Sequence, residues 1–565
     1  MAVDTVEPER AADGLRRRFA LPHLQAGIWG VAVVAAVVAL PIIAVLLESL
    51  QLDAALWRHL ADTVLADYVV NTLGLMIGVG LAVAFGGVAT AWLVTMHRFP
   101  GRDLFEWALL LPLAMPAYVL AYTYTDLLQF AGPVQTALRQ AFGWSRGDYW
   151  FPPVHSLGGA VVLFSAVLYP YVYALARAAF IEQSVCVLEV SRTLGRGPWA
   201  TFFRVALPLA RPAIAAGVAF ALMETLADFG AVQYFGLSTF VSGIYRAWYA
   251  LASPPVAAQL ASALLGFVLL VILLERMTRG AGRQAHSTNV YRGIEGRRLK
   301  PAGAAAAIAV CAAPILVGFV IPAAVLVRLG LSSDLDIDPG RFGMVIANSF
   351  LLAAGAAILV AAVAVAVGFW VRADRHGIGR GLARVASLGY ATPGAVIAVG
   401  ILIAVAWIDR SVGGLIAAAT GHNAGLIVGG TIVALLYGYL ARFFSVAYAP
   451  VEAGLSKIRP SLEGAARTLG CRPAAVLWRV HLPLMRPSVL SALVLVFVDV
   501  MKELPATMIL RPFNLDTLAV EAFRMATTER LPEAGLFSLV IVATGLVPVI
   551  ILSRTITRGR PGARD

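Results

Sequence analysis

Long apolar runs, separated by short polar segments, form the dominant pattern along the chain. A helix needs about 20 mostly apolar residues to cross a bilayer, and twelve runs reach that length. We expect membrane-spanning helices at residues 27–47, 72–96, 105–128, 156–180, 212–235, 256–275, 303–327, 348–371, 383–407, 424–448, 487–510 and 533–553. The first run follows DGLRRRF and exceeds the apolar core of a signal peptide, so we interpret it as a retained membrane helix. The pattern predicts an all-α, polytopic membrane protein.

Composition supports the same fold class. Of the 565 residues, 60% are hydrophobic and 13% are charged, whereas a soluble domain has about 25% charged residues. A single soluble core does not absorb this much apolar surface, and no soluble domain larger than a loop remains to be placed. The cysteines and histidines show neither metal-binding spacing nor an HExxH motif.

Basic residues gather in alternate loops, which predicts the orientation of the chain. Cytoplasmic loops carry an excess of Lys and Arg. With a cytoplasmic N-terminus, this side holds HRFPGR at 97–102, RADRHGIGRGLAR at 372–384, the basic stretch 275–300 and the C-terminal SRTITRGRPGARD, whereas the acidic SSDLDID lies outside. We therefore expect both termini in the cytoplasm. The net charge of +12 comes from these loops, so we expect no nucleic-acid partner.

The chain contains an internal repeat. RTLGRGPWATFFRVALPLARP at 192–212 matches RTLGCRPAAVLWRVHLPLMRP at 467–487, with 13 of 21 positions identical. Six spans per half is an even number, so the halves insert in the same orientation, as parallel repeats do. The predicted organisation is a cytoplasmic tail (1–26), a first half of six spans (27–275), a cytoplasmic linker (276–302), a second half of six spans (303–553) and a cytoplasmic tail (554–565).

The best-repeated segments are cytoplasmic loops, at about 181–211 and 449–486. Each copy predicts a short amphipathic helix, a turn at a glycine, and a second short helix that a proline ends. Similarity left over from a recent duplication is the alternative explanation, but the surrounding helices have diverged far more. The repeated loop therefore predicts that both copies dock on the same kind of partner.

This loop resembles the coupling motif of ABC importer permeases, which runs Glu-Ala-Ala, three residues, Gly and later Leu-Pro. The matching residues are Glu189, Gly195, Leu207 and Pro208 in the first copy, and Glu463, Gly470, Leu482 and Pro483 in the second. The copies depart from the motif in two places. Val190 and Ser191 replace the two alanines, and Glu463 precedes its glycine by seven residues instead of six, with Gly464 at the usual Glu position.

The resemblance implies a transport subunit that is not itself an enzyme. In such importers each loop inserts into a cytoplasmic ATPase subunit, so two loops imply two ATPase copies, with ATP and Mg held there and no cofactor bound by this chain. A substrate-binding protein delivers the cargo from outside, and the expected location is the inner membrane of a bacterium. The chain has no Gly-Lys-Ser/Thr phosphate loop of its own, which fits this division of labour.

Ionisable residues lie within two predicted spans at equivalent places. Charged side chains are costly at the centre of a bilayer and usually mark a pathway or a pairing site. The residues concerned are Glu224 and Asp228 in the first half, and Asp499, Lys502 and Glu503 in the second. Residues four apart share a helix face, so each helix is expected to present two carboxylates toward one axis. They line a translocation pathway and contact a cation there transiently, or they form structural pairs with Lys502; neither hypothesis excludes the other.

The stretches METLADFGAVQYFG and MKELPATMILRPFNLDTLA are similar to those of the fused permeases of ferric-iron importers. The resemblance implies ferric iron as cargo, and carboxylates suit hard cations. Thiamine, polyamine or phosphonate cargo is the alternative within the same class. Tyr118, Tyr122 and Tyr124 are further candidates for ferric ligands, although tyrosines at helix ends more often form the interfacial aromatic belt.

Two other classes of protein compete with this interpretation. A secondary transporter driven by an ion gradient also explains the parallel repeat and the buried acids, but it does not explain why a cytoplasmic loop is the most repeated element. A membrane enzyme needs a catalytic cluster, and the sequence shows no Ser/His/Asp set and no metal-binding spacing.

Overall fold

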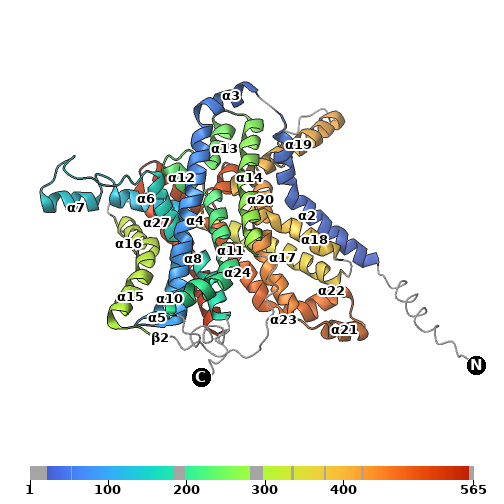
Figure 1. Cartoon of the computed structure of the whole chain (residues 1–565). Helices are drawn as coiled ribbons and strands as arrows, with labels where there is room; N and C mark the ends of the chain where they lie inside the picture. The colour runs from blue at the N-terminus through green and yellow to red at the C-terminus, as the bar shows by residue number, and fades with distance from the viewer. Residues whose placement is uncertain are drawn as a thin grey trace, which may run out of the picture. The chain divides into compact units, whose positions relative to one another are not determined.

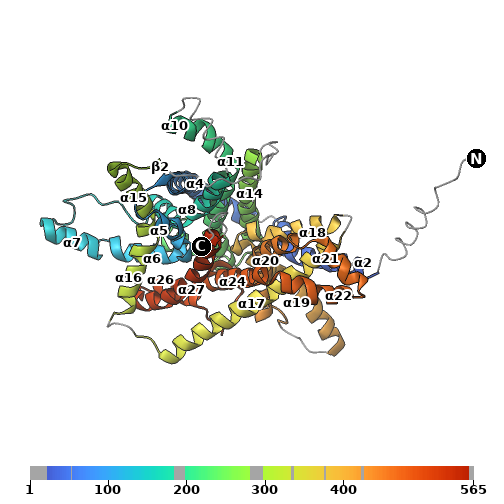
Figure 2. The ribbon, with the colours of Figure 1, turned by 90° about the horizontal axis from the view of Figure 1, so that it is seen from below.

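We analysed a computed structural model of the chain, which describes residues 22–51, 54–182, 197–279, 297–332, 336–374, 377–420 and 426–558. These residues are almost entirely helical (Figures 1 and 2). Across these ranges, strand pairing is limited to the two-residue segments β1 (His97–Arg98) and β2 (Arg297–Arg298), which pair in parallel. The predicted all-α class is confirmed.

The described helices bear out the polytopic prediction. Ten of them are long and apolar enough to cross a membrane, and the number rises to twelve if each of two bent helix pairs counts as one span. The bent pairs are Arg102–Ala114 with Ala117–Phe142, at 92°, and Pro473–Leu484 with Arg486–Lys502, at 79°. The span predicted at 105–128 is therefore interrupted instead of straight, whereas the second bend lies just before the span predicted at 487–510.

The chain forms two compact units that group segments distant in sequence. Unit 1 comprises the described residues within Met1–Ile43, Leu352–Tyr390 and Leu436–Val500. Its elements are α2 (Pro22–Glu48), α17 (Pro339–Ala373), α18 (Ile378–Ala386), η4 (Ser387–Ala391), α20 (Ile432–Ser456), α21 (Pro460–Thr468), α22 (Pro473–Val476), η5 (Leu477–His481), α23 (Leu482–Leu484) and α24 (Arg486–Lys502), of which α2, α17, η4, α20 and α24 continue into unit 2. The repeat-based division at 276–302 stays a prediction.

Close backbone approach holds unit 1 together. A Cβ on Gly389 would lie 1.8 Å from the carbonyl oxygen of Ala441, so only glycine fits this contact. The Tyr437 hydroxyl donates a hydrogen bond of 2.6 Å to the Val37 carbonyl, which links α20 to α2. Small residues at helix contacts and interhelical hydrogen bonds are the usual means of helix association inside a bilayer.

Unit 2 contains the described parts of Ala44–Leu351, Ala391–Leu435 and Met501–Asp565. Its further elements are α3 (Ala54–Thr63), α4 (Leu65–Met96), α5 (Arg102–Ala108), η1 (Leu111–Ala114), α6 (Ala117–Leu128), α7 (Pro133–Phe142), α8 (Leu157–Glu182), α10 (Pro198–Thr201), η2 (Phe202–Ala206), α11 (Leu207–Ala227), α12 (Gly230–Tyr234), α13 (Phe240–Tyr249), α14 (Pro254–Arg279), α15 (Pro301–Ile315), η3 (Leu316–Val320), α16 (Ile321–Gly330), α19 (Gly394–Thr420), α25 (Pro505–Leu510), α26 (Leu518–Thr527) and α27 (Leu531–Arg558).

The long helices α4, α8 and α11 pack along one another in unit 2 (Figure 1). A Cβ on Gly217 of α11 would lie 2.7 Å from the Cα of Val172 in α8, so the backbones meet closely. On the outer side of α4, Ile77, Leu81 and Phe85 are exposed at a spacing of four residues. Side chains four apart share one face of a helix, so α4 presents an apolar stripe of the kind that faces lipid.

Candidate functional site

The second copy of the repeated loop folds as the sequence predicts, with a glycine turn between two helices. Helix α21 ends at Thr468, and Gly470 follows with φ at +81°. The N–H of Cys471 donates to the Ala466 carbonyl at 3.0 Å, which closes the helix end. A residue without Cβ is favoured at such a left-handed position. Space is open around Gly470, because a Cβ there would meet no atom within 4 Å.

Glu463 is held inside unit 1 by basic side chains. Its carboxylate lies 3.3 Å from Arg372 Nε and 2.7 Å from Arg467 Nη2, and the Glu463 side chain is only 13% exposed. Arg372 also donates to the carbonyls of Leu455 and Ile458, at the end of α20 and just beyond it. Arg372 therefore fastens α21 and the end of α20 to α17. The Glu463 carboxylate is therefore directed toward its own chain.

The prolines do not end the second helix of each loop, contrary to the sequence prediction. Each proline is the second residue of a helix, and a π-turn precedes that helix: η2 before Leu207 and Pro208, and η5 before Leu482 and Pro483. A proline lacks the N–H and clashes with the carbonyl four residues earlier, and the wider π-turn accommodates both effects. In the first copy the helix continues to Ala227, whereas the second copy bends by 79° between Leu484 and Arg486.

Large apolar side chains are exposed at equivalent places of the two loops. Phe203 is 57% exposed and its equivalent Trp478 is 70% exposed; Leu209 and Leu484 form a second exposed pair. Exposed apolar side chains on a loop are typical of a docking surface. The first-copy candidates Glu189 and Gly195 lie outside the described residues.

Two spans that the sequence predicts as continuous are broken at their acidic residues. Helix α11 ends at Ala227, and α12 starts at Gly230. Helix α24 ends at Lys502, and α25 starts at Pro505. Asp228 and Glu503 each lie in the break, so the expectation that acids four apart share one continuous helix face is wrong.

Both acids cap the short helix that follows the break. Asp228 Oδ1 accepts the N–H of Ala231 at 2.7 Å. Glu503 Oε1 accepts the N–H of Ala506 and Oε2 that of Thr507, both at 2.9 Å. A carboxylate at this place satisfies backbone donors that have no partner within the helix. The equivalent residues of the two halves thus make the same interaction.

An aromatic cluster in unit 2 joins the two breaks. A Cβ on Gly230 would lie 2.6 Å from the Cβ of Tyr118 and 2.7 Å from Leu504, so all three meet closely. Phe229 stacks on Tyr245 with ring centroids 3.6 Å apart, and the Tyr245 hydroxyl donates to the Pro505 carbonyl. The ends of α11 and α24 are therefore positioned against the same side chains.

Tyr118 is buried within the influence of two acids instead of lying in an aromatic belt. It is 4% exposed, and its hydroxyl has no hydrogen-bond partner within the described part of the chain. Asp228 and Glu503 are both within electrostatic reach of it. Tyr122 and Tyr124 are buried as well and donate to Ser538 and to the Val317 carbonyl. The interfacial-belt interpretation of these three tyrosines is wrong, because their hydroxyls face the interior of unit 2.

The other candidate pathway residues are half-buried. Glu224 lies within α11, and Asp499 and Lys502 lie near the end of α24. Asp499 belongs to unit 1 and the other four charged candidates to unit 2, so the convergence of four acids on one axis stays a prediction. Across the described ranges, no group of three or more His, Cys, Asp or Glu side chains is arranged to hold a metal ion.

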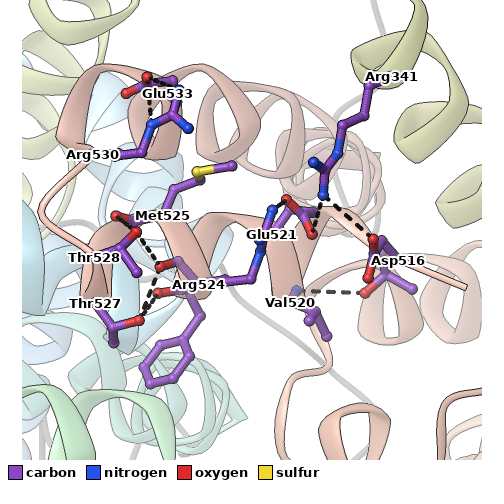
Figure 3. A network of polar contacts seen from close by, with 12 residues as sticks. Arg341, Asp516, Val520, Glu521, Arg524, Met525, Thr527, Thr528, Arg530 and Glu533 are labelled. Atoms are coloured by element: carbon purple, nitrogen blue, oxygen red, sulfur yellow. Dashed lines mark hydrogen bonds and ion pairs between the residues drawn. The ribbon is translucent and has the colours of Figure 1, made fainter. Parts of the chain in front are cut away.

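A network of ion pairs connects α17 to α26 and was not found by sequence reasoning (Figure 3). Arg341 Nη2 lies 3.5 Å from Glu521 and 3.7 Å from Asp516, and Arg524 donates to Glu521 at 2.6 Å. The Glu521 side chain is fully buried, and its hydrogen bond raises the pKa of Arg524. Next to it, Arg530 pairs with Glu533 at 2.6 Å. This network ties the corner between α26 and α27 to the start of α17.

Long apolar helices, a glycine-turn loop in the second half and matching helix breaks in both halves are the features of a polytopic membrane protein with an internal repeat. The chain belongs to the family described as binding-protein-dependent transport system inner membrane component, which matches residues 82–283 and 364–559. The chain is thus a fused, two-half permease of a binding-protein-dependent ABC importer.

Three transport proteins that are named differently resemble the chain. It is 24% identical to the Fe(3+)-transport system permease protein FbpB 2 of Haemophilus influenzae, over 87% of this chain and 90% of that protein. It is 25% identical to the probable ABC transporter permease protein y4fN of Sinorhizobium fredii, over 91% and 90%. It is 33% identical to the molybdenum transport system permease protein ModB of Escherichia coli, over 29% of this chain and 68% of that protein.

Proposed function

We propose that this permease moves ferric iron from an extracytoplasmic binding protein into the cytoplasm, across the inner membrane of a bacterium. The single observation that carries the proposal is the pair of helix breaks in unit 2, which hold Asp228 and Glu503 near Tyr118, whose hydroxyl has no hydrogen-bond partner among the described residues. Carboxylates and phenolates are hard oxygen donors that suit hard cations. The iron named for the Haemophilus influenzae relative supports the same cargo.

Transport is powered by two copies of a cytoplasmic ATPase, one on each loop, which hold ATP and Mg. The exposed side chains at equivalent places of the two loops support two similar docking events. Both termini are cytoplasmic in this arrangement. The chain itself hydrolyses no ATP and binds no cofactor. The acids at the breaks contact the cargo transiently during passage.

Other cargoes differ from ferric iron in their charge and in the ligands they need. The Escherichia coli relative is named for molybdenum. As the anion molybdate, this cargo would be repelled by the carboxylates Asp228 and Glu503. Thiamine and polyamines are cationic organic molecules, so the acids suit them too, but they make no use of a phenol as a metal ligand. Phosphonate cargo meets the same repulsion as molybdate.

Uptake into proteoliposomes tests the cargo. The chain, its ATPase and its binding protein are reconstituted with ATP inside, and radiolabelled ferric iron, molybdate, thiamine and a polyamine are offered separately. We expect ATP-dependent uptake of iron alone. Uptake of another cargo in place of iron overturns the iron assignment but keeps the transporter class. Uptake that follows an ion gradient without ATP supports a secondary transporter.

Gly470→Val is expected to uncouple the permease from its ATPase. A β-branched residue at φ +81° costs about 1–2 kcal/mol locally, but no atom of the loop lies in its way. The variant is therefore expected to fold. Its binding to the ATPase is measured by co-purification and is expected to be lost. Gly470→Asn is the control, because Asn tolerates the left-handed conformation. Unchanged binding by the Val variant contradicts the docking role.

Tyr118→Phe is expected to make the protein more stable and to slow iron uptake. The removed hydroxyl is buried without a partner, so its loss should raise the free energy of unfolding by about 1 kcal/mol. Iron uptake should fall by about tenfold if the phenol contributes about 1.4 kcal/mol to passage of the cation. Thermal unfolding and uptake rates are measured on the same preparation. A more stable variant with unchanged uptake shows that the phenol does not touch the cargo.

A further inference from the structure

The segment between α6 and α8 forms an amphipathic, aromatic projection that the transport function does not use. It starts where α6 ends at Leu128 and finishes where the span α8 begins at Leu157. It includes α7, whose residues Val134, Leu138 and Phe142 share one face at a spacing of four. Polar side chains occupy the other face. Helices of this kind lie in the plane of a membrane interface.

Helix α7 extends away from α4, α6 and α8 in both views of the molecule (Figures 1 and 2). In Figure 1 its axis runs across the long axes of α4 and α8 instead of along them. Because α4 and α8 are long and apolar enough to span a membrane, the space beside them belongs to lipid. A helix that leaves the bundle sideways at the end of a span therefore meets the headgroup layer.

Aromatic rings gather on this segment. Phe142 stacks on Trp144 with centroids 4.6 Å apart, and Trp144 stacks on Tyr149 at 5.3 Å. Phe142 is 62% exposed, and Trp150 is 82% exposed. Trp and Tyr are enriched at the membrane–water interface, where one end of the ring is apolar and the other is wet. Large rings exposed on a short segment fit an apolar partner such as the acyl boundary of a bilayer.

Two arginines give the segment a charge that fits phosphate. The Arg139 guanidinium lies 4.1 Å from the centroid of Phe130, and that of Arg146 lies 5.5 Å from the same ring. Within the described part of the chain, neither arginine pairs with a carboxylate. The nearby Asp148 is bound by the Ser145 N–H and hydroxyl, at 2.6 and 2.7 Å. Residues 129–156 carry two arginines and one aspartate, a net charge of +1 with His neutral.

Arg146 lines a hollow of about 380 Å³ beside α7, and Arg139 reaches the wall of this hollow through Tyr149. Its lining combines the apolar Phe130 and Phe151 with the polar Gln135, Arg146 and Tyr149. The Tyr149 hydroxyl donates to Gln135 at 2.7 Å and accepts from Arg139 at 3.2 Å, which fixes the wall of the hollow. A mixed apolar and cationic cup of this size suits the glycerophosphate part of a phospholipid.

We propose that residues 129–156 form an interfacial anchor that lies in the phospholipid headgroup layer, with Phe142 and Trp150 directed into the acyl boundary and Arg139 and Arg146 at the phosphates. The anchor fixes the outer end of the interrupted span α6 at the membrane surface. The proposal does not depend on which cargo the permease moves.

Spin-label depth measurements on the full chain test the anchor. Cys186, Cys311 and Cys471 are replaced by alanine, and single labels are placed through Phe142→Cys and, as the matched control on the polar face, Gln140→Cys. The variants are reconstituted in vesicles of phosphatidylethanolamine and phosphatidylglycerol. We expect the Phe142→Cys label about 5–10 Å below the phosphate level, with oxygen more accessible to it than a water-soluble nickel complex. The Gln140→Cys label should show the opposite preference.

Equal accessibility of both labels to the nickel complex overturns the proposal, because the helix then lies in water. Labels that become protected only when the binding protein is added also overturn it and assign the segment to that protein. Trp150→Cys provides a second label at a side chain that is 82% exposed, so a depth is obtained even if the Phe142→Cys variant fails to fold.

Discussion

Glu503→Ala is expected to abolish iron uptake and to lower the free energy of unfolding by about 2 kcal/mol. The carboxylate accepts hydrogen bonds from the N–H groups of Ala506 and Thr507 and from the Thr507 hydroxyl. Glu503, Ala506 and Thr507 are all buried. Without the carboxylate the two N–H groups lose their acceptor, whereas the Thr507 hydroxyl keeps the Glu503 carbonyl at 3.0 Å. Helix α25 also loses the cap that sets its start after the break. Chemical unfolding in detergent and uptake into proteoliposomes measure the two effects.

Glu503→Gln is the matched control for charge. The amide oxygen keeps one acceptor for the backbone donors, so most of the stability should remain. A loss of uptake in this variant, at nearly unchanged stability, assigns the function to the negative charge. Unchanged uptake in the alanine variant contradicts both roles, because neither the cap nor the charge would then be needed.

Arg372→Ala is expected to uncouple ATP hydrolysis from transport and to destabilise the part of unit 1 around α21 by about 2–3 kcal/mol. Its guanidinium binds the Glu463 carboxylate and the carbonyls of Leu455 and Ile458, and the two charged side chains are only 18% and 13% exposed. Removing it leaves Glu463 with Arg467 as its close basic partner and frees α21 from α17. Coupling is measured as the ratio of cargo moved to ATP hydrolysed.

Arg372→Lys separates charge from geometry at the same place. Lysine keeps the charge but cannot reach three acceptors with a planar fork, so an intermediate coupling ratio is expected. Wild-type coupling in the alanine variant contradicts the view that α21 must be held to α17 for force to pass through the loop.

The helices and the loop could be predicted because their signals are local. Apolar runs of sufficient length predict spans, and the repeated glycine predicts the turn that Gly470 makes with a positive φ. The helix breaks were missed because the apolar run continues through Asp228 and Glu503 without a polar gap. The Glu503–Leu504–Pro505 sequence did contain a signal, since an acid shortly before a proline is typical of a helix start.

Other parts of the site depend on contacts between distant segments. The spacing of Glu521 and Arg524 predicts a pair within one helix, but nothing in the local sequence predicts that Arg341 joins them from α17. In the first half, Gly243 follows the capping Thr239 at the place where Glu521 follows Thr517, and it packs against Tyr68 instead. The burial of Tyr118 and the internal pairing of Glu463 likewise become visible only in the folded chain.

ATP hydrolysis by the reconstituted complex tests the central claim most directly. The chain is combined with its ATPase and with a binding protein that is either empty or loaded with ferric iron. The account predicts that the iron-loaded protein stimulates hydrolysis and that the stimulation disappears when both Gly195 and Gly470 are replaced by bulky residues. Failure of any ATPase to bind, with uptake driven by a proton or sodium gradient instead, contradicts it.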